Sequence, residues 1–228
     1  DVVLIEDFIP GREYALEGLL ENGRLRVLAL FDKPDPLNGP CFEETIYVTP
    51  SRLAQAMQQA IAEAAQRACT LAGLASGPVH AEMRVNELGV WLLEIAARSI
   101  GGLCGRILRH ALGMSLEEVI LRHALDQTVP LARHGEASGV MMIPIPGRGI
   151  FRGARNVESA MQVSGITAIE VTASPGQVIA PPPEGASYLG FIFAQATSPD
   201  AVESSLREAH RRLAFDIQAD LPVNRARA

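Results

Sequence analysis

The chain of 228 residues carries a formal net charge of −6 and 48% hydrophobic residues, a composition typical of a folded globular protein. Its basic residues form no long run, so we expect no nucleic-acid partner. No apolar run approaches the roughly 18–20 residues of a membrane helix, so we expect no membrane partner either. Three cysteines, an odd number without metal-like spacing, predict reduced thiols in a cytoplasmic protein.

The first seven residues, DVVLIED, contain neither a methionine nor a leader segment. We therefore expect the chain to be part of a longer protein. Residues 2–6 are apolar and β-branched, which predicts a buried strand.

A β-hairpin is predicted next, because Asn22-Gly23 separates two strand-like segments, residues 12–20 and 24–31. Residues 32–41 hold three prolines and predict a loop. Lys33 in this loop could reach a phosphate, but we expect it to be solvated. Residues 44–48 predict a further strand.

Helical spacing follows. Thr49 is the expected N-cap and Pro50 the first helical residue of a long helix that Gly73 closes. Ser115 and Glu118 form a capping box before another helix. The remaining expected elements of this part are strands at 78–85 and 90–96 and helices at 100–111 and 116–125.

A polar stretch at residues 126–137 is the expected linker between two units. The first unit, residues 1–125, is predicted to be α+β with an antiparallel sheet flanked by helices. The second, residues 138–216, is predicted to be a smaller β-rich domain with a terminal helix, followed by a loosely ordered tail at 217–228. Its expected elements are strands at 139–145, 149–152, 168–171 and 188–196 and a helix from Ser198 to Ala214.

Two glutamates lie in the segment HAEMRVNELGVWLLEIAAR, residues 80–98. If a turn centres on Glu87, Glu82 and Glu94 become near-diagonal neighbours on adjacent antiparallel strands, on one face unless a bulge intervenes. Paired carboxylates suit Mg²⁺ or Mn²⁺, and Arg98 just beyond could bind a phosphate or carboxylate. Alternatively, both glutamates face solvent with Arg98 as an ion-pair partner, and His80 has a structural role.

Three segments in order, LIEDFIPGREYALEGLL, GPVHAEMRV and WLLEIAARSIGG, resemble the C-terminal half of an ATP-grasp ligase. The segment YLGFIFAQATSPDAVESSLREAH resembles the C-terminal domain that follows it in biotin carboxylase-like and L-amino-acid ligase-like members. The resemblance implies the C-terminal half of an ATP-grasp fold, with the N-terminal half of the same protein as its missing partner. It also implies ATP and Mg²⁺ (or Mn²⁺) as cofactors, small-molecule carboxylate and amine substrates, an acyl-phosphate intermediate and a possible homodimer.

The resemblance also assigns roles to single residues. An adenine-contacting hinge is implied at Glu6, Asp7, Phe8 and Ile9, a ribose contact at Glu13, metal ligands at Glu82 and Glu94, a catalytic phosphate-binding group at Arg98, and substrate contacts at Glu44, Ser99, Gly101 and Gly102. Each position also has a structural reading. The hinge could be core packing, Glu13 and Glu44 could be surface residues, and the loop at 99–102 could be a turn that enters a helix.

One position departs from the family pattern. The E-x-N-x-R motif is Glu94-Ile95-Ala96-Ala97-Arg98 here, so Ala96 replaces an asparagine that serves the family as a metal ligand. This favours an L-amino-acid ligase-like activity for the intact enzyme and leaves its second metal open. The alternatives are a biotin carboxylase-like carboxylation and a non-catalytic nucleotide-binding subunit. In the family, the triphosphate is also held by an upstream subdomain. A chain without that half of the clamp is expected to bind nucleotide weakly and not to catalyse ligation.

Overall fold

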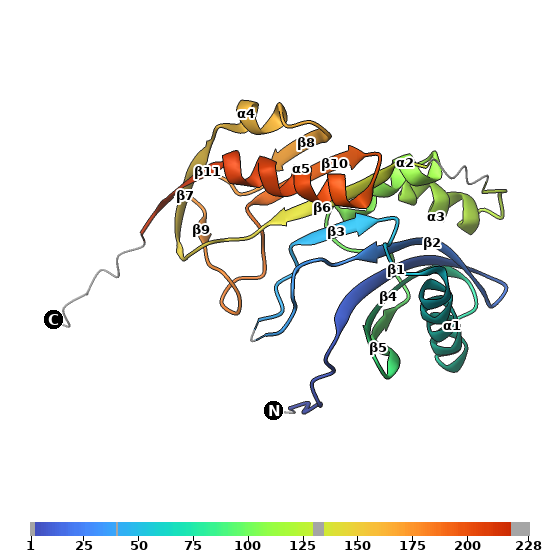
Figure 1. Ribbon diagram of the computed structural model, residues 1–228. Helices are drawn as coiled ribbons and strands as arrows, with labels where there is room; N and C mark the ends of the chain where they lie inside the picture. Colours follow the sequence, from blue (N-terminus) through green and yellow to red (C-terminus); the bar gives the residue numbers. More distant parts are fainter. Residues whose placement is uncertain (1–2, 40, 130–134, 220–228) are drawn as a thin grey trace.

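A computed structural model describes residues 3–39, 41–129 and 135–219 of the chain. Its main feature is an eight-stranded sheet in the order β5-β4-β1-β2-β3-β6-β10-β8 (Figure 1). Every pairing in it is antiparallel. The strands are β1 (Arg12–Glu21), β2 (Arg24–Asp32), β3 (Ile46–Thr49), β4 (Gly77–Asn86), β5 (Gly89–Ala96), β6 (Ala137–Ile143), β8 (Ile166–Val171) and β10 (Gly190–Ala196).

A second, three-stranded sheet has the order β11-β7-β9, with β7 (Gly149–Arg155), β9 (Val178–Ile179) and β11 (Ala214–Gln218). The sequence pattern did not predict β9, β11 or the short helix α4 (Val157–Met161). These elements are short, so they carry too few residues to show a hydrophobic period. Residues 220–228 of the expected tail lie outside the described residues.

Helices cover both faces of the main sheet (Figure 1). On one face, α1 (Gln55–Leu71) packs on β1 and β4 around Leu16, Ile61 and Met83, and α5 (Pro199–Arg212) packs on β6 and β10. The opposite face carries the 3-10 helix η1 (Cys104–Ile107), α2 (Leu108–Leu112) and α3 (Leu116–Ala124). The predicted α+β class with an antiparallel sheet flanked by helices is therefore confirmed.

The predicted hairpin and two-glutamate strands are confirmed, and of the capping box the Ser115 half is present, whereas the Glu118 carboxylate bonds Arg122. One expected strand and two expected helix starts are wrong. Thr49 is the last residue of β3, where it pairs with Ser138 of β6, so it is not free to cap a helix. The helix begins at Gln55 instead. Residues 3–6 form no strand and are exposed, because no neighbouring strand pairs with them. The helix expected from residue 100 begins only at Cys104.

The sheet runs without interruption across the expected linker, because β3 of the first unit pairs with β6 of the second. Two ion-pair groups add to this junction. Arg52 contacts Asp32 as well as Asp200 of α5, and Arg207 of α5 contacts Asp35. The division into units 1–125 and 138–216 stays a prediction, and residues 130–134 of the expected linker lie outside the described residues. Among the described residues, no helix is long and apolar enough to cross a membrane.

Candidate functional site

Strand alternation builds a polar patch beside η1, on the face of the sheet opposite α1. Glu13 and Glu17 of β1 are four residues apart, and His80 and Glu82 of β4 are two apart. Both spacings are even, so each pair points to one face of the sheet. Tyr14 and Leu16 of β1 and Ala81 of β4, at the alternate positions, pack against α1, which explains why a mostly apolar sequence keeps these carboxylates. The tertiary structure thus gathers ionisable groups that the sequence lists far apart.

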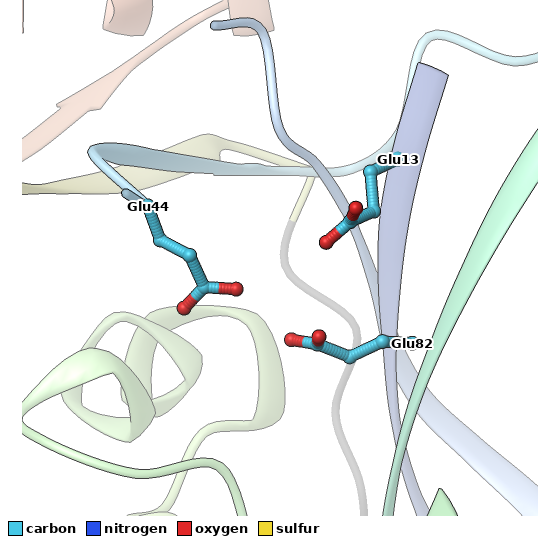
Figure 2. A group of neighbouring side chains, drawn as sticks. All are labelled: Glu13, Glu44 and Glu82. Atoms are coloured by element: carbon cyan, nitrogen blue, oxygen red, sulfur yellow. The ribbon is translucent and has the colours of Figure 1, made fainter. Parts of the chain in front are cut away.

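Lys33 lies at the centre of this patch and is not solvated, so that expectation is wrong. Its side chain is only 3% exposed, and its Nζ atom lies 2.8 Å from Glu13 and 2.7 Å from Glu82 and also donates to Glu44. Figure 2 shows the carboxylates of Glu13, Glu44 and Glu82 pointing toward one another. Burial alone would lower the pKa of Lys33, but the charges of Glu44, Glu82 and Glu13 outweigh it and raise that pKa, so the ammonium form is kept.

A second buried chain of contacts joins the patch to the loop that follows β5. His80 bonds Glu17 through Nδ1 at 3.1 Å and Glu82 through Nε2 at 3.4 Å. Glu17, which is fully buried, also accepts from the backbone N–H of Ile100 at 3.1 Å. Burial opposes a charged imidazole, but the bonds to Glu17 and Glu82 outweigh it and raise the pKa of His80 to about 9. The predicted structural role of His80 is consistent with these contacts, and Glu17 was not foreseen.

Glu82 and Glu94 stand directly opposite each other, not near-diagonally as predicted. A bulge lies between the pairs Glu82–Glu94 and Met83–Leu92, which leaves Leu93 as the extra residue of β5. Without that bulge Glu82 would face Leu93, so the irregularity brings the two carboxylates together. Glu82 is partly buried and its pKa is lowered: burial raises it, but the bond from His80 and the charge of Lys33 outweigh burial.

Glu94 and Arg98 occupy the open side of the site. Arg98 lies 3.5 Å from Glu94, and both side chains are more than half exposed, so the ion pair itself is weak. Both face a cleft of about 670 Å³, which Ser99, Gly101, Gly102 and Glu44 also line. The structure therefore brings the predicted metal, catalytic and substrate residues to one cleft, and their roles stay predictions.

The predicted hinge, Glu6 to Ile9, runs along the edge of the same patch. Arg84 donates to the carbonyl of Ile9 at 2.7 Å and to Glu13 at 3.0 Å, and its guanidinium lies 4.7 Å from the ring centre of Phe8. Glu6, Asp7 and Phe8 are exposed, so core packing does not explain the segment. Glu13 is buried rather than on the surface.

The close carboxylate group and the predicted metal pair differ. Glu13, Glu44 and Glu82 have oxygens within 4.8 Å of one another, a spacing that could hold a metal ion, whereas Glu94 is outside this group. However, the Lys33 ammonium already bonds all three carboxylates. We therefore give more weight to the Glu82–Glu94 side, where oxygen ligands face the open cleft.

Two segments of the chain match known protein families. Residues 1–107 match the family described as the ATP-grasp domain, and residues 141–218 match the L-amino acid ligase C-terminal domain 2. The chain is 26% identical to dapdiamide A synthase of Enterobacter agglomerans over 96% of the chain and 52% of that protein.

Two solved structures extend the comparison. An L-amino acid ligase from Bacillus licheniformis is 28% identical and superimposes with a TM-score of 0.83 over 92% of this chain and 53% of that one. A biotin carboxylase from Campylobacter jejuni, described as a beta-gamma-ATP complex, shares the fold with a TM-score of 0.66 at 16% identity, over 93% of this chain and 48% of that one. The chain thus spans about half the length of the relatives it matches.

Proposed function

We propose that this chain, whose residues 1–107 belong to the ATP-grasp domain family, is the nucleotide- and metal-binding half of an ATP-dependent carboxylate–amine ligase of the L-amino-acid type. The observation that carries the proposal is the cleft in which Glu82 and Glu94 stand opposite each other beside Arg98 and the glycine-containing loop. The match of residues 141–218 to an L-amino acid ligase domain supports the substrate class.

In the proposed reaction, a substrate carboxylate attacks the γ-phosphate of ATP, which gives an acyl phosphate and ADP, and an amine then displaces phosphate. The chain's contribution is to position the reactants and balance their charge, because phosphoryl transfer needs little covalent help from a protein. Arg98 would hold the transferred phosphate or the acyl phosphate in the cleft. Backbone N–H groups of residues 99–102 would approach the anionic substrate.

Glu82 and Glu94 would hold Mg²⁺ (or Mn²⁺). Their oxygen-only donor set and their place on the cleft fit such an ion. When bound with ATP, the ion neutralises phosphate charge. Glu44 also lines the cleft and is partly exposed, and there it would meet a substrate ammonium group.

For ATP, the proposed contacts are main-chain groups of Glu6, Asp7, Phe8 and Ile9 around the adenine and the Glu13 carboxylate at the ribose. Glu13 is already bonded to Lys33 and Arg84, so only lone pairs that these donors leave free could accept a ribose hydroxyl. Since the chain spans about half of its relatives, we propose that it needs the other half of the clamp, binds nucleotide weakly by itself and does not turn over.

The test uses the full-length ligase. We expect MgATP-dependent phosphate release that requires an amino acid, and we expect Glu94→Gln to lower kcat/KM on the order of 10- to 100-fold and to raise the Mg²⁺ requirement. Glu87→Gln is the matched control, because it removes the same charge from the exposed turn of the same hairpin.

Other outcomes would refute the proposal. Phosphate release that depends on bicarbonate and biotin, and not on an amino acid, would identify the carboxylase alternative. Absence of any ATP turnover in the full-length protein would identify a non-catalytic nucleotide-binding subunit. Activity that survives both Glu82→Gln and Glu94→Gln would show that the metal site is misassigned.

A further inference from the structure

Lys33 is the single lysine of the chain, whereas the other nineteen of its twenty basic residues are arginines. An arginine presents a planar fork of donors, but a lysine ends in a compact ammonium with three donors and no acceptor. The position where the chain uses its lysine is one where three carboxylates converge on one point. The ammonium matches this geometry, because each of its three hydrogens meets a different carboxylate.

The contacts leave no donor of Lys33 free for another partner. Glu13, Glu44 and Glu82 each accept from Nζ, and the Nζ atom also lies 5.0 Å from the ring centre of Tyr47. The side chain is 3% exposed, so water does not compete for these bonds. Removing the carboxylates would leave the buried ammonium without compensation and destabilise the folded state. Removing the ammonium would likewise leave the three carboxylates uncompensated.

A divalent ion and this ammonium would compete for one place. The three carboxylate oxygens lie within 4.8 Å of one another, which is a spacing that suits a metal ion. Two of the ammonium contacts measure 2.8 and 2.7 Å, whereas Mg²⁺ requires oxygens at about 2.0–2.1 Å. Binding of the ion in the cage would therefore require Lys33 to leave and the carboxylates to move closer.

We propose that Lys33 is a positioning residue whose ammonium fills the cage of Glu13, Glu44 and Glu82, keeps divalent ions out of it, and so confines the metal to the side of Glu82 that faces Glu94. The exclusion from the cage stands on geometry alone, and the confinement to the Glu94 side rests on the proposed function. In the ligase, the Lys33 ammonium would thus keep Glu44 from binding the metal. The Glu44 carboxylate would then stay available for the substrate ammonium.

The experiment measures Mn²⁺ binding to the nucleotide-free full chain by electron paramagnetic resonance and needs no turnover. We expect Lys33→Met, which keeps an unbranched side chain one atom shorter and removes its charge, to bind Mn²⁺ at least about tenfold more tightly than the wild type. Adding Glu13→Gln should abolish this gain, because Glu13 belongs to the cage and not to the Glu82–Glu94 pair.

The matched control is Glu13→Gln alone, which keeps Lys33 in place. Here we expect the wild-type affinity for Mn²⁺, since the cage is closed to the ion. A weaker affinity in this variant would show that the cage is the metal site and would overturn the inference. Equal Mn²⁺ affinities of Lys33→Met and wild type would overturn it as well.

Loss of folding in Lys33→Met still gives a result. If three uncompensated carboxylates prevent folding, added Mn²⁺ should restore the circular dichroism spectrum of the folded chain, and failure to do so would count against the inference. A second measurement uses the wild type: with a single lysine, ¹⁵N-lysine labelling gives one side-chain ammonium signal. The signal should persist at saturating Mg²⁺, shifted only through Glu82, which contacts both the ammonium and the proposed metal. Loss of the signal, as for an ammonium released to solvent, would overturn the inference. Failure of the proposed ligase activity would leave all these readouts unaffected.

Discussion

The stability of the chain should depend on pH through His80. The imidazole lies between two carboxylates, Glu17 and Glu82, and its folded-state pKa is about 9 against an ordinary value of 6.5. A difference of this size corresponds to about 3 kcal/mol, because each tenfold change in proton affinity is worth about 1.4 kcal/mol. A raised pKa means that the folded state holds the proton more tightly. The stabilisation is therefore complete below pH 6.5 and is lost as the pH rises through about 9.

Urea unfolding between pH 6 and 9.5, followed by circular dichroism, tests this directly. Relative to His80→Gln, which cannot titrate, the wild type should lose up to about 3 kcal/mol of unfolding free energy across that interval. His210→Gln is the contrasting control, because burial lowers the pKa of His210 and its effect must therefore lie below pH 6.5. Parallel pH profiles for wild type and His80→Gln above pH 6.5 would refute the reasoning, since the two carboxylates would then not stabilise the imidazolium.

Three further predictions concern packing and capping, each measured by chemical denaturation. Ile61→Ala should lower the free energy of unfolding by about 2–5 kcal/mol, because Ile61 is fully buried between α1 and the sheet. Leu71→Ala on the same helix is the control: that side chain is 89% exposed, so the change should be less than about 0.5 kcal/mol. Gly139→Ala should lower the free energy of unfolding by about 1–3 kcal/mol, since its new methyl group would lie 2.6 Å from Val202 of α5 and 2.9 Å from the Tyr47 carbonyl oxygen. Gly153→Ala, where the methyl group would enter open space, should lower it less. Equal losses in the two variants would contradict this. Ser115→Ala should cost about 1 kcal/mol by removing the bond from the Glu118 N–H at the start of α3, and an unchanged midpoint would show that this cap contributes nothing.

The sequence alone determined the elements that follow from local chemistry. Asn22-Gly23 marked the first hairpin, and Ser115 with Glu118 marked the start of α3. The short turn after Asn86 also placed Glu82 and Glu94 on neighbouring strands. These signals succeed because turn geometry, capping and strand alternation each depend on residues only a few positions apart.

Tertiary structure decided what depends on pairing between distant segments. Residues 3–6 have the composition of a strand but pair with no neighbour, and Thr49 has the chemistry of a cap but pairs with β6. The bulge at Leu93 sets whether the two glutamates face each other, and no local signal marks it.

The same holds for the interior of the site. Lys33 stands in a proline-rich segment that by itself suggests solvent, and Glu17 stands in an apolar strand that by itself suggests nothing. Lys33 is buried because Glu13, Glu44 and Glu82 arrive from three other places in the chain and compensate its charge. The energy of a buried charge is fixed by its neighbours in space, and those neighbours exist only once the sheet has formed.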